Sequence, residues 1–270
     1  MPEAGRPVII PLPGAKEAGV SIPIVPASVD DVIDLDISHG STGYLLSLYK
    51  SDRSLMVETE NRGLHLGSLN AKRVVEFGNP HSIFHLSYEG EVTAMKNGER
   101  LPGNYQNIYF HPSGCYGLTA DGEIQLIAAG AISEEYSELA KLPQQNRNIV
   151  SLSFGNSHAV ALTRTGEVIS WGEDIASVIS QSRAELGPFR SAIAVRNSTV
   201  AISRSGRIVG WGAGITGREQ TVFDELVEIS DAEEAFSAIG GKVCIRRTGR
   251  RWIVLNPPTE KNEIWSFAPD

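Results

Sequence analysis

The chain has 270 residues, a hydrophobic fraction of 41% and a formal net charge of −8 at pH 7. This charge argues against a general nucleic-acid binder, which presents a basic face, and no apolar run reaches the roughly 18–20 residues of a membrane-spanning helix. The start of the chain has no basic segment followed by a long apolar stretch, the pattern of a secretory signal. We therefore expect a cytoplasmic protein without nucleic-acid or membrane partners.

The first 26 residues contain six prolines. Because proline fixes φ and has no backbone N–H, this density excludes a helix. We predict that residues 1–32 form an extended arm, separate from the repeats that follow.

The remainder of the chain, residues 33–270, repeats one short pattern six times. The clearest copy runs from Phe154 to Gly172 and reads Phe-Gly-Asn-Ser-His-Ala-Val-Ala-Leu-Thr-Arg-Thr-Gly-Glu-Val-Ile-Ser-Trp-Gly. The next copy ends in the same way at Trp211, and in both the tryptophan falls five residues after a glycine. Self-similarity at a fixed period predicts a repeat architecture. The predicted repeats cover about 33–72, 73–105, 106–147, 148–189, 190–229 and 230–270.

The weaker copies are aligned by a glycine in the middle of the pattern. The aligned residues are Gly90, Gly122, Gly166, Gly206 and Gly249, and the first copy has Asp52-Arg53 at this place. Glycine supplies the positive φ that a hairpin turn needs, and the flanking segments are apolar or β-branched, as strands prefer. Each copy therefore predicts two strands around a tight turn.

A unit of about 40 residues cannot enclose a core alone, so each repeat must pack on its neighbours. We predict an all-β fold, a β-propeller of six or seven blades, whose ring is closed by the N-terminal arm. Short helices are possible between blades. Residues 133–142 have a capping serine and an acidic first turn before Pro143, and residues 174–186 form a weaker candidate.

The pattern resembles a known family of repeats. Gly155 and His158, followed by the turn glycine and the Trp-Gly pair, are similar to the regulator of chromosome condensation repeat, a β-propeller family. The resemblance is best over residues 147–212 and fainter over 33–130 and 230–256. The family's Asn-x-x-Gly-Gln-Leu-Gly segment after Trp-Gly is absent from every copy. The resemblance implies a propeller, usually of seven blades.

Two sets of residues are candidates for partner binding. Four arginines surround Gly249, and their planar side chains suit carboxylate or phosphate groups. The acidic residues just upstream, between Asp224 and Glu234, are the alternative, because they could neutralise the arginines within the chain. The tryptophans at equivalent repeat positions could anchor a partner or pack between blades. The candidates are Arg246, Arg247, Arg250, Arg251, Trp171 and Trp211.

The sequence contains none of the common catalytic or phosphate-binding motifs, and we expect no enzymatic activity, cofactor or metal. Four histidines lie in or beside the start of their repeats, where we expect hydrogen bonds within each blade rather than a metal site. The histidines are His39, His81, His111 and His158. We expect Cys115 and Cys244, which lie in different repeats, to be free thiols.

The function predicted from these features is a non-enzymatic protein-interaction module, a scaffold that acts as a monomer on an unknown protein partner. Three alternatives stay open. They are a dedicated protein inhibitor, as in a bacterial β-lactamase-inhibitory propeller of the same broad repeat class; a guanine-nucleotide exchange factor for a small GTPase; and a carbohydrate-binding propeller.

Overall fold

The computed structural model divides at Ala120 into two compact units. It describes residues 32–40, 43–50, 52, 55–59, 63–67, 71–77, 82–94, 97–129, 137–172, 187–212, 231–238, 242–248, 251–255 and 264–267. Residues 1–31 of the predicted N-terminal arm lie outside these ranges, as does the whole of the second helix candidate, residues 174–186. The predicted domain boundaries stay a prediction.

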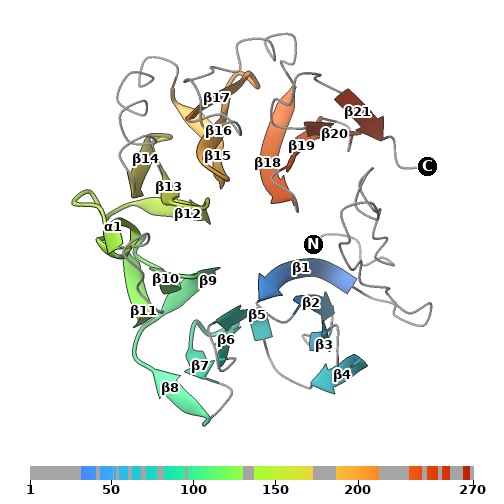
Figure 1. The fold of residues 1–270 in the computed structure, drawn as a ribbon, viewed down its shortest axis with the longest axis vertical. Coiled ribbons are helices and arrows are strands. Elements are labelled where there is room, and N and C mark those ends of the chain that lie inside the picture. Colours follow the sequence, from blue (N-terminus) through green and yellow to red (C-terminus); the bar gives the residue numbers. More distant parts are fainter. Residues whose placement is uncertain are drawn as a thin grey trace. The chain divides into compact units, whose positions relative to one another are not determined.

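The first unit consists of small antiparallel sheets that follow one another along the chain (Figure 1). One sheet has the order β1-β2-β3-β4, formed by Val32–Gly40, Gly43–Lys50, Leu55–Thr59 and Gly63–Gly67. The next has the order β5-β6-β7-β8, formed by Ala71–Phe77, Ser82–Ser87, Val92–Ala94 and Glu99–Leu101. The hairpin of β9 and β10 then covers Tyr105–His111 and Gly114–Thr119.

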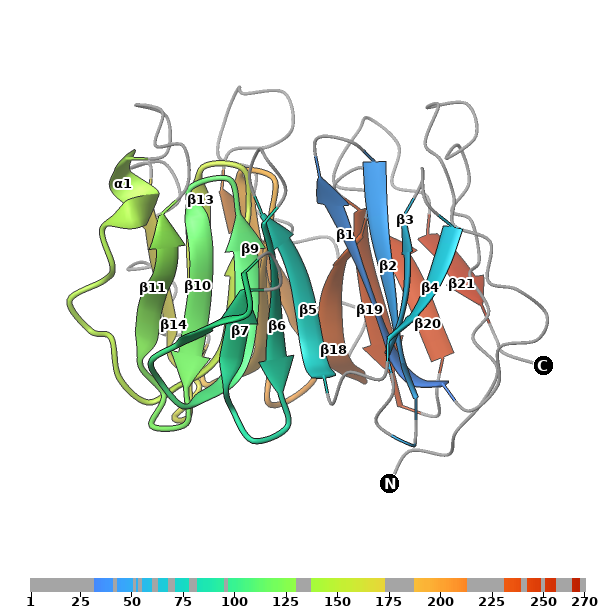
Figure 2. The same cartoon turned by 90° about the horizontal axis from the view of Figure 1, so that it is seen from below.

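The second unit repeats this plan (Figures 1 and 2). It opens with β11 (Ile124–Ala129) and the short helix α1 (Ser137–Ala140). Two three-stranded sheets follow, β12-β13-β14 over Ile149–Phe154, His158–Thr163 and Val168–Gly172, and β15-β16-β17 over Phe189–Val195, Ser198–Ser203 and Ile208–Gly212. The last sheet, β18-β19-β20-β21, covers Ala232–Ala238, Lys242–Arg247, Arg251–Leu255 and Ile264–Phe267.

The turn glycines predicted from the repeat pattern occupy equivalent hairpins. Each lies in the left-handed region, with φ of +87° at Gly90, +81° at Gly122, +91° at Gly166 and +85° at Gly206. In three of these turns the glycine N–H donates to the carbonyl of the residue three positions before it, as from Gly166 to Thr163 at 2.9 Å. The hairpin prediction is confirmed at these positions.

The last copy of the pattern falls on the β19–β20 hairpin, in which Arg247 pairs with Arg251. Its predicted turn residue, Gly249, lies outside the described residues.

The same hydrogen bond joins each turn to the sheet that follows it. The carbonyl of the turn glycine accepts the amide N–H of the first residue of the next sheet's first strand. The donors, with N–O distances, are Tyr105 to Gly90 (2.9 Å), Ile149 to Gly122 (2.9 Å), Phe189 to Gly166 (2.8 Å) and Ala232 to Gly206 (3.3 Å). The turn thus shapes one hairpin and also fixes the start of the next sheet.

The first strand of each of the six described sheets has a β-bulge at its second residue. The register shifts occur between Val32 and Asp34, Ala71 and Arg73, Tyr105 and Asn107, Ile149 and Ser151, Phe189 and Ser191, and Ala232 and Glu234. A bulge leaves one residue unpaired and increases the twist of the strand. Its recurrence at one position shows that these sheets are copies of a single structural unit.

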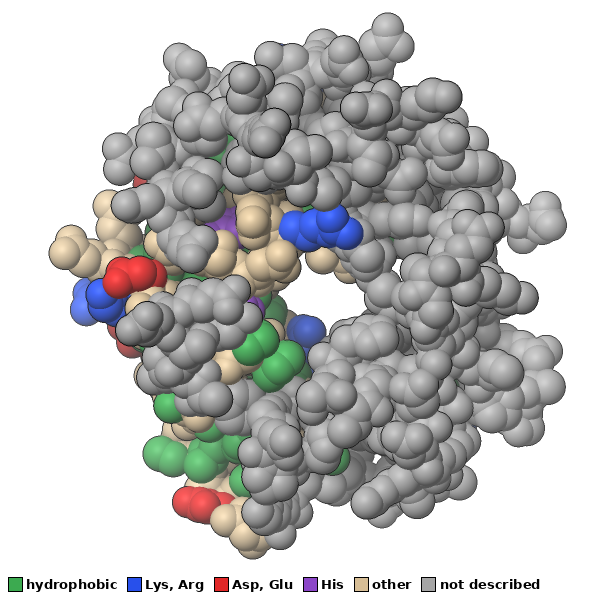
Figure 3. Space-filling model, in the orientation of Figure 1, with side chains coloured by type: hydrophobic (Ala, Val, Ile, Leu, Met, Phe, Trp, Pro, Cys, Tyr) green, Lys and Arg blue, Asp and Glu red, His purple; other side chains and the backbone are tan. Residues whose placement is uncertain are grey.

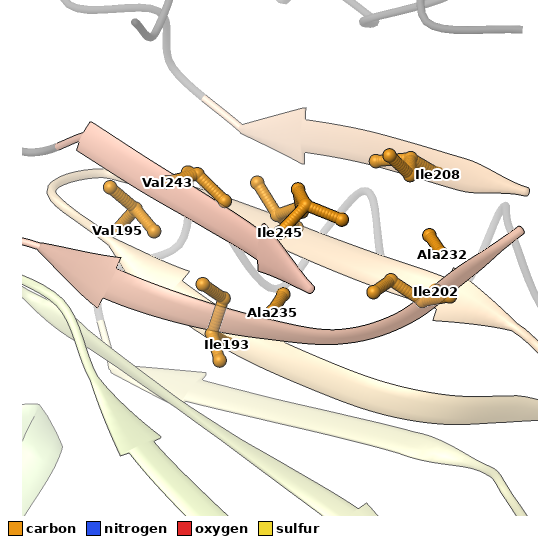
Figure 4. Packing of buried hydrophobic residues seen from close by; sticks show 9 residues of the cluster. Ile193, Val195, Ile202, Ile208, Ala232, Ala235, Val243 and Ile245 are labelled. Carbon is orange, nitrogen blue, oxygen red and sulfur yellow. The ribbon is translucent and has the colours of Figure 1, made fainter. Parts of the chain in front are cut away.

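The cores lie between successive sheets, as packing between repeats requires. In the second unit, side chains from β15, β16 and β17 pack on those from β18 and β19 (Figure 4). The members are Ile193, Val195, Val200, Ile202, Ile208, Ala232, Ala235, Val243 and Ile245. A second cluster joins the β12–β14 sheet to the β15–β17 sheet and includes Val160, Leu162, Phe189 and Trp211.

The predicted all-β propeller class is confirmed by this series of small, consecutive antiparallel sheets. Of the predicted helix at 133–142, residues 137–140 are helical as α1, and residues 141–142 are not. Within the described ranges, no helix is long and apolar enough to cross a membrane.

Candidate partner-binding groove

A cavity of about 710 Å³ lies beside β14 and Trp211 of β17. Its walls come from the segment after α1, from the turn and strand of β14, and from the start of β15. The lining residues are 143–145, 165–170, 187–189 and Trp211. This volume falls within the range of small-ligand and peptide pockets, and Glu167 is the one charged residue among those that line it. We call this cavity the β14–β17 groove.

Trp211 forms part of the core behind the groove. It is 1% exposed, and its ring lies 6.1 Å from the ring of Phe189. Its Nε1 is buried and has no hydrogen-bond partner in the structure, and the same holds for the Oγ of Ser170 in the groove wall. Buried polar atoms are nearly always hydrogen-bonded, and leaving one unpaired costs about 1–3 kcal/mol. Two residues that line the groove therefore each have a buried polar atom without a hydrogen-bond partner.

Trp171 has the equivalent position in the preceding sheet but a different environment. Its Nε1 donates to the carbonyl oxygen of Leu139 in α1 at 3.2 Å. Leu139 is buried, and a Cβ added to Gly172 would lie 3.2 Å from its Cδ2. The α1 segment thus packs against Trp171 and Gly172, and it lies beside β11 and β14 (Figures 1 and 2). The indole N–H of Trp171 is therefore already used by a hydrogen bond within the chain.

The arginines of the candidate site have acidic neighbours. Arg246 on β19 forms ion pairs with Glu233 at 3.4 Å and with Glu234 at 3.0 Å on the facing strand β18. Arg247 pairs with Asp231 at 2.5 Å. These ion pairs neutralise Arg246 and Arg247 within the chain, which is the alternative to partner binding that the sequence left open. Arg250 lies outside the described residues, and Arg251 is placed only as the first residue of β20.

One histidine of the repeat pattern, His158, belongs to the framework. His158 is fully buried, and its Nε2 lies 3.3 Å from Thr199 Oγ1 in the next sheet. The neighbouring glycine allows the two sheets to approach, because a Cβ at Gly155 would clash with the carbonyl oxygen of Arg196, 2.2 Å away. That carbonyl accepts the amide N–H of Asn156 at 2.8 Å. The Phe-Gly-Asn-x-His sequence is therefore a contact between repeats.

A serine–histidine contact that the sequence reasoning missed lies in the β9–β10 turn. Ser113 Oγ is 2.7 Å from His111 Nδ1 and 2.8 Å from the hydroxyl of Tyr116. All three side chains are buried, and burial raises the pKa of Tyr116. The proximity of the two residues in sequence was the available signal, but only the hairpin brings the hydroxyl and ring nitrogen together. These contacts connect the two ends of the β9–β10 turn.

Cys115 on β10 is fully buried, and burial raises its pKa to about 12, so the thiolate is disfavoured. Both cysteines are free thiols, and Cys244 on β19 is partly buried. Among the side chains that the structure describes, no three His, Cys, Asp or Glu residues are grouped so as to hold a metal ion. On the face shown in Figure 3, the coloured charged side chains are scattered rather than gathered into one patch.

Several solved structures resemble this chain at low sequence identity. Human WBSCR16 is 14% identical, with a TM-score of 0.46 over 64% of this chain and 60% of its own. Prp20p from Saccharomyces cerevisiae is 16% identical, with a TM-score of 0.44 over 69% and 59%. The WD40 ectodomain of the Arabidopsis thaliana receptor kinase ACR4 is 12% identical, with a TM-score of 0.45 over 82% and 93%. The matches cover only about 60% of the first two proteins' own lengths.

No curated protein matches the chain at a significant level. Residues 149–174, which form the sheet from β12 to β14, match the family model of the Regulator of chromosome condensation (RCC1) repeat. This range includes the Phe-Gly-Asn-Ser-His sequence and Trp171-Gly172, whose contacts between repeats are described above. The predicted resemblance is confirmed, and the chain carries a repeat of the regulator of chromosome condensation type.

Proposed function

We propose that the chain is a protein-interaction module that performs no catalytic step of its own. The proposal rests on the structural roles of the histidine and serine side chains that could otherwise act in catalysis. His158 joins two sheets through Thr199, and His111 and Ser113 join the ends of one turn. These groups hold a rigid framework, and the β14–β17 groove is a surface feature that such a framework can present to a partner.

The match to the regulator of chromosome condensation repeat supports the same function, because the sequence resemblance implies an interaction propeller. The partner in this proposal is a protein, and the chain acts as a monomeric scaffold. Arg250 and Arg251 are proposed as a second contact, for an acidic partner surface, since Arg246 and Arg247 already have acidic partners within the chain.

The proposal is tested with purified components. The full chain is immobilised, proteins are captured from cells that express it, and the most enriched candidates are purified and titrated into the chain by calorimetry. We expect at least one candidate to form a saturable complex with a Kd of about 10 μM or below. If none of the purified candidates binds saturably, the interaction function is wrong.

The proposed arginine contact has its own variant. Arg250→Ala with Arg251→Ala is expected to weaken the purified complex by at least about tenfold, because even one hydrogen bond to a charged group contributes about 1.5–3 kcal/mol. Arg100→Ala is the matched control, since it removes an exposed arginine from a different sheet. Equal affinities for the double variant and the control would show that the proposed arginine contact is wrong, without affecting the proposed interaction function.

A further inference from the structure

Two neighbouring turns of the second unit carry an arginine at the same position. Arg164 lies in the β13–β14 turn and Arg204 in the β16–β17 turn, and both residues are exposed. Their backbone N–H groups make equivalent hydrogen bonds, to the carbonyl oxygens of Asn148 at 2.8 Å and Pro188 at 3.1 Å. The repeat therefore places two arginines at the same end of adjacent sheets.

Backbone carbonyl oxygens hold two guanidinium groups at this end of the sheets. Arg204 Nη2 donates to the carbonyl oxygen of Thr165, in the preceding turn, at 3.2 Å. Arg190, at the bulge of β15, donates from Nε to the carbonyl oxygen of Ser203 at 3.1 Å and from Nη2 to that of Arg204 at 2.9 Å. A guanidinium has five N–H donors, so these bonds orient both groups and leave more than half of their donors for a partner.

The positive charges of this surface have no acidic partners among the residues that the structure describes. The described arginines that form ion pairs lie on β8, ahead of β12 and on β19. Those that form none, which we call the arginine rim, are Arg164, Arg190, Arg204 and Arg207. Glu167 is the one acidic residue of the two turns, so the local formal charge is +3, against −8 for the whole chain.

The charge of the rim and that of the whole chain together define the ligand. Arginine side chains pair with carboxylates through two parallel hydrogen bonds. A long polyanion such as a nucleic acid would extend beyond the rim, over a chain whose net charge of −8 repels it. A short acidic peptide interacts mainly with charges within the Debye length, which is about 8 Å at physiological salt, and so meets mainly the rim.

We propose that the arginine rim binds a short segment of a partner protein through the carboxylates of its aspartate or glutamate side chains. The inference rests on the proposed function, because it names the chemistry of a partner segment that the interaction module recognises. It assigns a surface that includes neither Arg250 nor Arg251.

The probe is a synthetic peptide of about ten residues in which serine and glutamate alternate, labelled with fluorescein at one end. The control peptide has glutamine in place of every glutamate. Each is titrated with the full chain in about 50 mM salt and followed by fluorescence anisotropy. We expect the glutamate peptide to bind saturably, with a Kd of about 0.05–0.5 mM, and the glutamine peptide not to bind. Equal binding of the two peptides, or none by the glutamate peptide, overturns the proposal.

One double variant removes charge from the rim without removing a contact of the fold. The side chains of Arg164 and Arg207 make no hydrogen bond within the described ranges, and Arg164→Gln with Arg207→Gln is expected to weaken peptide binding about three- to tenfold. The matched control, Arg100→Gln with Arg147→Gln, changes the net charge equally at arginines that already have acidic partners. We expect it to change the Kd by less than about twofold. Equal weakening by both would mean that only net charge matters, and would overturn the proposal.

The two carbonyl-bound arginines have a variant of their own. Arg190→Gln with Arg204→Gln is expected to weaken peptide binding by about tenfold, and urea denaturation shows whether this chain remains folded. Backbone amide NMR signals of the native chain locate the peptide without any substitution. We expect the amides of Thr165 and Ser205 to shift saturably, and that of Gly98, in the β7–β8 hairpin, to stay unchanged. Saturable binding without shifts in the two arginine turns overturns the proposal.

The remaining outcomes separate the rim from the proposed function. A labelled oligonucleotide of about ten nucleotides that binds the native chain more tightly than the glutamate peptide would assign the rim to nucleic acid and overturn the proposal. If the peptide fails but a purified partner binds the native chain in calorimetry, the rim is wrong and the proposed function stands. If both fail, the proposed function is wrong as well.

Discussion

The turn glycines illustrate how a single residue connects two repeats. Gly166 has a φ of +91°, and a Cβ at this position would lie 2.6 Å from the carbonyl oxygen and 2.9 Å from the amide nitrogen of Phe189. Position 166 therefore requires a residue without a side chain, for two reasons. Its backbone is left-handed, and the backbone of the next sheet begins directly beside it.

Gly166→Ala is expected to lower the free energy of unfolding by about 2–3 kcal/mol, through backbone strain and displacement of the next sheet. Gly98→Ala is the matched control. Its φ is +69°, but nothing lies within 4 Å of an added Cβ, so only strain of about 1 kcal/mol is expected. Urea denaturation of the two variants measures both values. Equal losses would show that the contact with Phe189 is not a constraint.

Because of Cys115, the free energy of unfolding depends on pH in the alkaline range. Burial raises its pKa from 9.0 to about 12 in the folded chain, so the unfolded chain loses this proton first as the pH rises. Cys115 leaves the free energy of unfolding unchanged below about pH 9 and reduces it between about pH 9 and 12, by up to about 1.4 kcal/mol per pH unit.

We expect Cys115→Ala to be less stable than the native chain at pH 8, because a buried side chain is shortened, and to lose stability less steeply above pH 9. Urea denaturation between pH 8 and 11 gives both slopes. Burial also raises the pKa values of Tyr105 and Tyr116, and the charge of Cys115 raises both further, so the comparison measures Cys115 together with its effect on these two tyrosines. Parallel pH dependences would mean that the Cys115 thiol is not desolvated as described.

At the scale of the elements, adjacent sheets are joined by side chains as well as by cores. The contact of His158 Nε2 with Thr199 Oγ1 spans β13 and β16, and both residues are fully buried. Ser153 Oγ accepts the amide N–H of Ala194 at 3.0 Å, and Ser191 Oγ accepts that of Ala235 at 3.2 Å. These bonds fix the position of one sheet on the next, which apolar contacts alone do not specify.

Thr199→Val is expected to destabilise the chain by about 1–3 kcal/mol, because it deprives the buried His158 Nε2 of its hydroxyl partner. Thr199→Ser is the control, since it keeps the hydroxyl and removes one methyl group, for a loss of about 1 kcal/mol. Thermal or urea unfolding compares the two. A valine variant as stable as the serine variant would show that the hydroxyl contributes nothing.

The repeats and their hairpins could be predicted because the information is local. A glycine such as Gly166 and the β-branched residues after it report the turn and strand within a few positions. In the last copy, the pairing of Arg247 with Arg251 forms a hairpin where the pattern predicts one. The recurring bulge leaves no clear mark in the sequence, since the bulged residues include Lys72, Val150 and Glu233.

The candidate site could be predicted only in part. The sequence identified Trp171 and Trp211 as an equivalent pair, with partner binding and packing as the two interpretations. Their difference depends on Leu139, which lies 32 positions before Trp171 and reaches it only through the fold. Likewise, the acidic residues near Arg246 and Arg247 were visible, but the choice of partners follows from the pairing of β18 with β19.

At the scale of the whole molecule, the central claim is that equivalent sheets are joined in series by one recurring backbone bond. Hydrogen exchange of individual amides, followed by NMR in the native chain, tests this claim most directly. The amides that donate to the turn glycines are those of Tyr105, Ile149, Phe189 and Ala232. We predict that they exchange as slowly as the amides paired within the middle strands, such as β13 and β16. Exchange at the rate of exposed, unbonded amides at these positions would contradict the account.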